Sequence, residues 1–600
     1  MNRLEKIDSI LLVSFLALLI FPLPYMLRHL DDNTLTSWRW VFADGRMLKV
    51  FGIIALGIIA AFFMARTTFP DRNPPLFLFL LSFLTVVPLW QEPEVILDAS
   101  RYFLQAKHLE LYGIRHFFLE WGGAIGVWTD LPVVPFFYGI IFKHLGEVRI
   151  FIQVFNTALF SFTIVLTYLI GRILWNKETG LCAGLLLLGI PYLLTQVPLM
   201  LVDVPTMFLV TLCLYTFLNA VQTGGIPRIA LSSVAIFLAL FTKYSTWPML
   251  LILPVISFIS MKQSSFMAAQ RIILRRSIAV LATAGISAVA VLLAKYDVFT
   301  DQINILRTYQ WPGLDRWKES FASTFLFQVH PFISISALLG VFAAIRKRDV
   351  RFLIPGWFAV FVLALQVERI RYLLPLFPLL ALMAAYGLNE LKYPEVKRFV
   401  ALCAVTASLA LILGAYLPFL NKSTMANLRD AGRYLDTLPG EAVVIHALQQ
   451  KESAGNTEMA IPILDLFTRK RLIYPQERTL HPAGGKIKES PLRFSWEFRP
   501  PQFYSEDTTA DNYSAAVISS ESENPSQSPF SKGGTIFTLP FHSSPIVGEG
   551  ARRREISSPP FAKGGVGGFS LKTFASDTGA FRYKTFVTVF SRIRLAETAQ

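Results

Sequence analysis

The stretch that decides the fold is PLFLFLLSFLTVVPLWQEPEVILDASRY, residues 75–102. Its first part, residues 75–90, carries no charged side chain, whereas its second part holds Glu92, Glu94 and Asp98 close together. An uncharged apolar run approaching roughly 20 residues can cross the hydrocarbon core of a membrane. The stretch therefore predicts a membrane span followed directly by an acidic helix at the water boundary.

The composition of the whole chain agrees with this interpretation. Of its 600 residues, 53% are hydrophobic and only 16% are charged, and the mean hydropathy is +0.49. Soluble proteins carry roughly 25% charged residues. The chain is therefore predicted to be a polytopic membrane protein.

The net charge of +15 does not indicate a nucleic-acid partner, because the Lys and Arg residues are distributed among short loops. We therefore predict that nucleic acid is not a partner of this chain.

Thirteen apolar segments are predicted to cross the membrane, because each is bounded by polar loops and is close to the length of a span. They are residues 9–27, 48–65, 75–90, 149–171, 179–198, 203–221, 229–242, 246–260, 277–294, 326–344, 352–367, 373–389 and 399–419.

Basic residues gather in alternate loops between these segments, and cytoplasmic loops of membrane proteins are enriched in Lys and Arg. The loops concerned hold Arg3 and Lys6, Arg66 and Arg72, Arg172 and Lys177, Arg271, Arg275 and Arg276, Arg346, Lys347 and Arg348, then Lys392, Lys397 and Arg398. We expect a bacterial inner-membrane protein with a cytoplasmic N-terminus and an extracytoplasmic C-terminal domain. If 229–242 and 246–260 were one tilted helix, the orientation upstream would be inverted.

Segment Leu131–Leu145 is also apolar but is not counted as a span. Pro132, Pro135 and Lys143 argue against a full crossing. We expect it to lie at the interface, which makes residues 91–148 one long outer loop.

This topology places the ionisable residues near the ends of spans on one side of the membrane. Charge near a membrane is costly, so a one-sided gathering predicts a functional site. The alternative is that the cations extend only to lipid headgroups. The residues concerned are Asp98, Asp203, Lys243, Glu368, Arg369 and Arg371.

The spacing of the acids suggests proton transfer. Glu94, Asp98 and Tyr102 lie four residues apart, so on a helix they would share one face. A carboxylate beside apolar surface can act as a general base, because partial desolvation raises its proton affinity. The alternative for Asp98 is a helix cap or an ion pair with Arg101.

The later cations suggest phosphate binding. Arg369 and Arg371 precede a proline-rich span, and arginine is suited to bidentate binding of phosphate. Lys243 would add a point charge. Together they could stabilise the negative charge that develops on a phosphate leaving group.

Five short motifs, in chain order, resemble those of the C-type (GT-C) membrane glycosyltransferases. The resemblance is to bacterial relatives of the dolichyl-phosphate-mannose protein mannosyltransferases and of the lipid A aminoarabinose transferase, and it covers about residues 75–420. The motifs are Asp98-x-x-x-Tyr102, Leu131-Pro-x-x-Pro135, Val202-Asp203-Val-Pro205, Leu240-Phe-Thr-Lys243 and Arg371-Tyr-Leu-Leu-Pro375.

The resemblance implies a GT-C fold of about 13 transmembrane helices. It also implies that a hexosyl or pentosyl group moves, with inversion, from a polyprenyl-phosphate-sugar donor to an extracytoplasmic protein, lipid A or glycolipid acceptor. Asp98 would be the catalytic base, and Glu94, Tyr102 and Asp203 would support it or contact the acceptor. The donor phosphate would bind to three cations, Lys243, Arg369 and Arg371.

One position departs from the family pattern. Relatives often have Asp-Glu where this chain has Asp98-Ala99, so the second acid is missing from its usual place. We expect Glu94, one helical turn earlier, to substitute for it.

No metal ligand set is evident in the sequence. His108 and His116 are eight residues apart, and His144 and His330 stand alone. We predict that no metal is obligatory, although relatives that use lipid-pyrophosphate donors require a divalent cation. No glycine-rich phosphate loop is found either, which suits a lipid-linked donor better than a sugar nucleotide.

The chain is predicted to have three parts. Residues 1–74 form N-terminal transmembrane helices, residues 75–420 form the catalytic membrane domain, and residues 421–600 form a small α/β domain. Within the last part, a helix is expected at 426–438 and strands at 442–447, 471–474, 515–519 and 581–590. The Ser, Pro and Gly bias of residues 520–568 predicts a disordered insertion.

Two other functions are compatible with the sequence. A transporter or lipid flippase also needs many spans, but it usually shows internal repeats and polar groups near the bilayer midplane. A non-catalytic assembly protein would use the membrane part only as an anchor. We find no convincing repeat, and the charged residues lie at one face, so the glycosyltransferase is preferred.

Overall fold

The computed structural model describes residues 2–20, 47–66, 72–94, 97–311, 321, 323–365, 370–421, 425–448, 455–474, 493–505, 513–519, 569–575 and 585–592. These residues form two compact units, Met1–Ser423 and Thr424–Gln600.

The first unit is helical, and every predicted span overlaps one of its helices. The elements are α1 (Asn2–Ile20), α3 (Met47–Arg66), α4 (Pro74–Val86), η3 (Val87–Gln91), α5 (Asp98–Leu119), α6 (Val133–Leu145), α7 (Arg149–Leu174), α8 (Lys177–Leu188), α9 (Pro191–Gln196), α10 (Asp203–Thr223), α11 (Ile226–Leu240), α12 (Thr246–Met249), α13 (Ile252–Gln263), α14 (Met267–Ala294), α15 (Tyr296–Ile305), η4 (Leu306–Gln310), η6 (Ser323–Gln328), α17 (Pro331–Lys347), η7 (Val350–Phe352), α18 (Leu353–Leu365), α19 (Ile370–Leu373), η8 (Leu374–Leu376), α20 (Phe377–Leu388), α21 (Pro394–Leu411), η9 (Ile412–Tyr416) and α22 (Leu417–Leu420).

Within the described residues, eight helices are long and apolar enough to cross a membrane. They are Leu48–Arg66, Pro74–Gln91, Arg149–Leu174, Asp203–Thr223, Thr246–Gln263, Met267–Ala294, Ile370–Leu388 and Pro394–Leu420. The predicted class, a polytopic all-α membrane unit, is therefore confirmed.

Other predicted spans are shorter or interrupted helices. The segment predicted at 179–198 breaks between α8 and α9, where Ile190 is extended before Pro191. Proline disfavours a helical conformation in the residue before it and cannot donate a backbone hydrogen bond. A continuous helix is therefore not formed across this position.

The pair 229–242 and 246–260 forms separate helices. Helix α11 ends at Leu240, and α12 begins at Thr246 after a turn that carries Lys243. The alternative of a single tilted helix is thus wrong.

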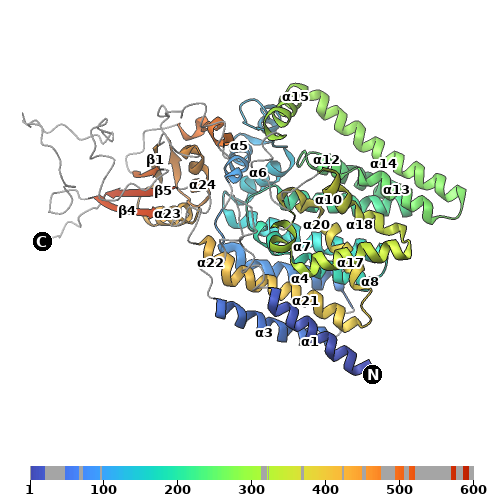
Figure 1. Ribbon diagram of the computed structural model, residues 1–600. Helices are drawn as coiled ribbons and strands as arrows, with labels where there is room; N and C mark the ends of the chain where they lie inside the picture. The colour runs from blue at the N-terminus through green and yellow to red at the C-terminus, as the bar shows by residue number, and fades with distance from the viewer. Residues whose placement is uncertain are drawn as a thin grey trace, which may run out of the picture. The chain divides into compact units, whose positions relative to one another are not determined.

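Loops predicted to share the cytoplasmic side meet one another in the structure. The ammonium of Lys392 lies 3.0 Å from the carboxylate of Glu5, and the indole nitrogen of Trp175 donates to Asp349 over 3.0 Å. Consistent with the first contact, α1 and α3 pack beside α21 (Figure 1).

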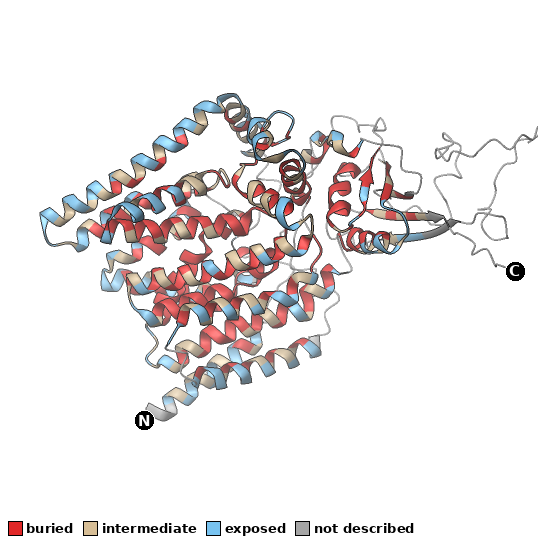
Figure 2. Ribbon diagram, turned by 180° about the vertical axis from the view of Figure 1, so that it is seen from behind, coloured by how far each residue is buried: buried red, intermediate tan, exposed pale blue. Residues whose placement is uncertain are grey.

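Burial differs sharply among the helices (Figure 2). Every residue of α20 is buried, whereas α14 buries only small or medium side chains along one line. Helix α17 packs closely against α20, because Gly387 has no Cβ atom that would collide with the carbonyl oxygen of Ser336. The exposed apolar side chains of α14 are suited to contact with lipid.

The acidic segment after the third predicted span is only partly helical. Residues 92–94 have no regular structure, and α5 begins at Asp98. The prediction that Glu94 shares a helix face with Asp98 is therefore wrong. The later part of the predicted outer loop forms α6, which packs on α5 so closely that Gly139 approaches the carbonyl oxygen of Ala106.

The second unit is an α/β domain, as predicted. Its sheet has the order β2-β1-β3-β5-β4. Strand β1 (Ala442–Leu448) pairs in parallel with β2 (Arg471–Ile473) and β3 (Tyr513–Ser519), and β5 (Phe586–Arg592) pairs antiparallel with β3 and β4 (Phe569–Ala575). Helices α23 (Ala426–Thr437) and α24 (Ala460–Leu466) accompany the sheet.

The expected helix at 426–438 and the first three expected strands are confirmed in this domain. The last expected strand overlaps β5, which begins at Phe586, whereas residues 581–584 lie outside the described residues. Strand β4 was not predicted. The insertion predicted at 520–568 lies outside the described residues.

Candidate active site

Four of the predicted site residues meet in the first unit, although they are far apart in the sequence. Arg371 donates from Nε to Asp203 Oδ2 over 2.9 Å and from Nη1 to Asp98 Oδ2. Lys243 donates from Nζ to Asp203 Oδ1 over 2.6 Å. The predicted base and two of the three predicted phosphate-binding cations, Lys243 and Arg371, are thus brought together.

The ends of helices position these four side chains. Asp98 and Asp203 are the first residues of α5 and α10, and Arg371 lies in the short helix α19. Lys243 lies in the turn after α11. The four charged side chains therefore lie at helix ends, in a short helix and in a turn, and not in the middle of a long apolar helix.

Two further residues complete the group. Arg101 donates to Asp130 through Nε and Nη2, both over 3.0 Å, and its Nη2 lies 3.4 Å from Asp98 Oδ1. Arg101 was considered as a partner of Asp98, but the sequence reasoning missed Asp130. The available signal was its position directly before the Leu131-Pro-x-x-Pro motif.

We call these six residues the charge cluster. They are Asp98, Arg101, Asp130, Asp203, Lys243 and Arg371. The three carboxylates balance the three cations. The Asp203 side chain is fully buried, whereas that of Lys243 is 18% exposed, so Lys243 is the more accessible of this pair.

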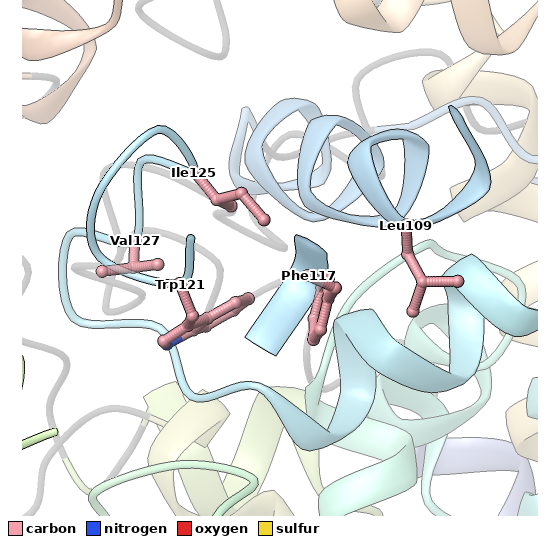
Figure 3. Close-up of a cluster of buried hydrophobic side chains, with 5 residues drawn as sticks. All are labelled: Leu109, Phe117, Trp121, Ile125 and Val127. Atoms are coloured by element: carbon pink, nitrogen blue, oxygen red, sulfur yellow. The ribbon is translucent and has the colours of Figure 1, made fainter. Parts of the chain in front are cut away.

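An apolar core supports the loop that carries Asp130. Leu109, Phe117, Trp121, Ile125 and Val127 form a buried cluster between α5 and the loop (Figure 3). The backbone N–H of Asp130 donates to the carbonyl oxygen of Val127 over 2.6 Å. Packing of these side chains therefore fixes where the loop delivers its carboxylate.

A buried glutamine joins this loop to the turn that carries Lys243. Gln302 of α15 donates from Nε2 to the carbonyl oxygen of Asp130 over 2.9 Å. Its Oε1 accepts from the hydroxyl of Tyr244 over 2.6 Å. Gln302 thus couples Asp130 to the residue next to Lys243, and no sequence motif indicated this role.

Glu94, predicted as a supporting acid, makes other contacts. Its carboxylate is fully buried and accepts from Arg149 Nε over 2.9 Å and from the backbone N–H of Met200 over 3.2 Å. These contacts connect the segment before α5 with α7 and with the loop before α10. The structure therefore gives Glu94 a bracing contact outside the charge cluster.

Tyr102 lies beside the charge cluster and is almost fully buried. The guanidinium carbon of Arg101 is 5.9 Å from the centre of its ring. Burial raises the pKa of the Tyr102 phenol, so its hydroxyl stays protonated. Arg369, the remaining predicted phosphate ligand, and Glu368 lie outside the described residues.

The environment of Asp130 combines burial with strong pairing. Burial raises the pKa of its carboxyl, and the guanidinium of Arg101 opposes that rise. Gln105 donates to the same carboxylate over 3.1 Å. A bidentate arginine favours the ionised form of a carboxylate.

Lys243 is held by a ring as well as by an acid. Its Nζ lies 5.0 Å from the centre of the Tyr372 ring, which is within the range of a cation–π contact. An anion that displaced Asp203 could therefore bind a cation that remains oriented. In the part of the chain that the structure describes, no three His, Cys, Asp or Glu residues are grouped so that they could hold a metal.

Comparison with known proteins supports a family relationship. Residues 130–294 match the family model described as dolichyl-phosphate-mannose-protein mannosyltransferase. This segment contains Asp130, Asp203 and Lys243 of the charge cluster. No curated protein matches the chain.

Solved structures with a related arrangement are distant in sequence. ArnT from Cupriavidus metallidurans bound to undecaprenyl phosphate matches 74% of this chain and 93% of its own, with 14% identity and a TM-score of 0.48. The same protein in the apo state matches 74% and 92%, with 12% identity and a TM-score of 0.49. The oligosaccharyltransferase AglB from Archaeoglobus fulgidus, in complex with an inhibitory peptide and a dolichol-phosphate, matches 76% and 70%, with 12% identity and a TM-score of 0.46.

Values as low as these do not establish a shared activity, so the relationship rests on the family match. It confirms the resemblance seen in the sequence for residues 130–294. Over this segment the chain is similar to the family described as dolichyl-phosphate-mannose-protein mannosyltransferase.

Proposed function

We propose that this chain is an integral membrane glycosyltransferase that moves a sugar from a polyprenyl-phosphate donor to an extracytoplasmic acceptor, with inversion at the anomeric carbon. The observation that carries the proposal is the charge cluster. It gathers three carboxylates and three cations from five separate segments of the chain. Such a gathering near a membrane is costly and indicates function.

In this reaction Asp98 acts as the general base. Its carboxylate takes the proton from the acceptor hydroxyl while the hydroxyl oxygen attacks the anomeric carbon. The bond between that carbon and the phosphate oxygen breaks, and polyprenyl phosphate leaves. Attack from the face opposite the leaving group inverts the configuration.

The cations of the cluster serve the leaving group. Lys243 is the more exposed partner of Asp203, and Arg371 lies between Asp98 and Asp203. When the donor binds, its phosphate competes with these carboxylates for Lys243 and Arg371, and Arg369 adds a third cation. Cations positioned on the phosphate stabilise the charge that develops there in the transition state.

The family name favours mannose as the sugar and a protein as the acceptor, and the proposal includes other hexoses or pentoses and lipid A or glycolipid acceptors. The site faces the outside of a bacterial inner membrane, with the N-terminus in the cytoplasm and the α/β domain outside. The α/β domain, in which β1 pairs in parallel with β2 and β3, is proposed to help bind the acceptor.

A reconstituted transfer assay tests the proposal. Purified chain in proteoliposomes is given polyprenyl-phosphate mannose, glucose or aminoarabinose, together with peptide and lipid A acceptors. The wild type is expected to transfer one of these sugars, and Asp98→Asn is expected to be inactive while it still inserts and purifies like the wild type. Turnover by Asp98→Asn at the wild-type rate would contradict the assignment.

The same vesicles distinguish glycosyl transfer from the alternative function, that of a transporter or flippase. That alternative predicts substrate movement across vesicles that contain no acceptor. It is less well supported because Asp98 and Asp203 begin helices, whereas transporters place such groups near the midplane. Flux without acceptor, and no sugar transfer, would favour it.

A further inference from the structure

We propose that Asp130 is a positioning residue for this reaction. By holding Arg101 in a bidentate pair it keeps that cation from closing on Asp98, and so preserves the proton affinity that Asp98 needs as a base. The proposal deepens the proposed function and rests on it.

The guanidinium of Arg101 contacts two acids, Asp130 and Asp98, at different distances. Both Arg101–Asp130 contacts are 3.0 Å long, whereas the contact of Arg101 with Asp98 is 3.4 Å. Two parallel hydrogen bonds fix the plane of a guanidinium. Arg101 is therefore oriented by Asp130, and Asp98 receives only its weaker contact.

Asp130 is itself held from several directions. Gln105 donates to its carboxylate over 3.1 Å and also to the carbonyl oxygen of Gly126 over 3.0 Å. Its backbone N–H is bonded to Val127, and its carbonyl oxygen accepts from Gln302. None of these contacts involves Asp98, so the carboxylate of Asp130 stays in place when a substrate displaces other members of the cluster.

The residues around Asp98 on its own segment offer Arg101 no second acid. Residue 99 is an alanine, and Glu94 is bound to Arg149. The structure instead brings a second carboxylate to Arg101 from a loop, at Asp130. This acid does not touch a reacting atom in the proposed mechanism, so it acts through Arg101.

Several charged groups face Asp98, and they determine the sign of the effect. Arg101 and Tyr102 lie on its own helix, Arg371 reaches it from α19, and Asp130 faces it from the loop. Asp203 and Lys243, on α10 and after α11, act through Arg371 and Asp203 respectively.

Removing the negative charge of Asp130 would lower the pKa of Asp98 through two separate changes. Arg101 would be left with Asp98 as its acidic partner within the cluster, and the repulsion between the two carboxylates would vanish. Both changes favour the ionised form of Asp98 and weaken it as a base. An opposite charge at this range lowers the pKa of a carboxyl by about 1 unit or more.

The experiment measures kcat and KM for transfer against pH in proteoliposomes. For Asp130→Asn, the acid limb of kcat is expected to move to lower pH by about 1 unit. The plateau kcat is expected to fall by up to about tenfold, because a base weaker by one unit loses at most that factor. The KM for the donor is expected to stay within about twofold. Asp130→Glu keeps the charge and should keep the limb in place.

A double variant tests the route through Arg101. Asp130→Asn with Arg101→Gln removes one acid and one cation, so the limb is expected to return to its wild-type position. Asp349→Asn is the control, because it removes a carboxylate that is paired with Arg351 outside the charge cluster. It should leave the limb unchanged.

Clear outcomes would overturn the proposal. The proposal fails if a folded Asp130→Asn variant has the same acid limb and the same plateau of kcat as the wild type. It also fails if the acid limb of the double variant stays displaced. If Asp130→Asn does not fold, the variant Gln105→Leu tests the proposal instead. It removes the hydrogen bond from Gln105 to the carboxylate of Asp130 without removing a charge. Its limb should move the same way by a smaller amount, and an unmoved limb counts against the role of Asp130.

The two levels of inference fail differently. A wild-type chain that transfers no sugar from any polyprenyl-phosphate donor overturns the proposed function and the role of Asp130 with it. If the wild type transfers sugar, but substitutions of Asp130 leave the pH dependence of kcat unchanged, only the positioning role is overturned.

Discussion

Glu94 and Asp98 lie four residues apart, yet their surroundings differ in kind. Glu94 is fully buried, and its oxygens accept from one arginine and one backbone N–H. Asp98 is 14% exposed and lies between two arginines that each also bind another acid. An acid with dedicated partners braces the structure, whereas an acid whose partners are shared can exchange them for a substrate.

Glu92, two residues before Glu94, shows a third environment. Its side chain is fully buried, and neither carboxylate oxygen has a hydrogen-bond partner in the described part of the chain. Burial raises its pKa well above the usual value, although the nearby Arg149 opposes the rise. The three acids of this short segment thus differ in their surroundings. Burial raises the pKa of Glu92, Glu94 has dedicated partners, and Asp98 shares its partners with other acids, and spacing alone would not distinguish them.

The largest expected effect separates Asp98 from Glu94 by activity. Asp98→Asn should lower kcat by roughly 10²- to 10⁴-fold, the contribution typical of a general base. Glu94→Gln, corrected for the amount of folded protein, should leave kcat within about twofold. Initial rates in the proteoliposome assay make the comparison, and equal losses in the two variants would remove the distinction.

The second effect separates the two acids by stability. Removing one partner of a buried ion pair costs about 3–5 kcal/mol, so Glu94→Gln should unfold at a clearly lower temperature than the wild type. Asp98→Asn leaves each arginine a second acidic partner and should unfold closer to the wild type. Thermal unfolding in detergent measures both.

A paired replacement sharpens this result. Glu94→Leu with Arg149→Met removes both charges and should recover most of the lost stability, because a buried ion pair can be replaced by apolar side chains at little cost. A double variant as unstable as Glu94→Gln would show that Glu94 braces the segment through Met200 alone.

The third effect concerns Lys243, a cation of the charge cluster, and its contribution to binding of the donor phosphate. Lys243→Met should raise the KM for the donor roughly tenfold or more, because one hydrogen bond to a charged group contributes about 1.5–3 kcal/mol. The plateau kcat should fall as well, because Lys243 is proposed to stabilise the charge that develops on the leaving phosphate. Lys262→Met, at the end of α13, is the matched control and should leave both constants unchanged. A rise in KM with both variants would point to surface charge rather than to the site.

Much of this arrangement was predictable from the sequence because apolar length and basic loops constrain a membrane topology strongly. The predicted spans overlap helices, and Asp98, Asp203, Lys243 and Arg371 meet as the topology required. Short motifs sufficed here because each acid or cation stands out in an apolar chain.

The missed residues depend on three-dimensional packing instead. Asp130 joins Arg101 only because the core around Phe117 and Trp121 turns the loop back toward α5. Gln302 carries no charge and no motif, so its link to Tyr244 could not be inferred from spacing. Glu94 was misassigned because a helical period was extended past Asp98, where the helix begins.

The smallest effect tests the neutral acid, Glu92. Because its folded-state pKa is raised, its contribution to stability is full below the unfolded pKa, about 4.3, and is lost as the pH rises through the folded-state pKa. Glu92→Gln replaces a neutral acid by a neutral amide, so the variant should match the wild type at low pH and exceed it in stability at high pH. The difference should reach about 1.4 kcal/mol for each unit by which the pKa is raised. Thermal unfolding between pH 4 and pH 9 would show the two curves diverging, and parallel curves would mean that Glu92 is ionised and shares Arg149 with Glu94.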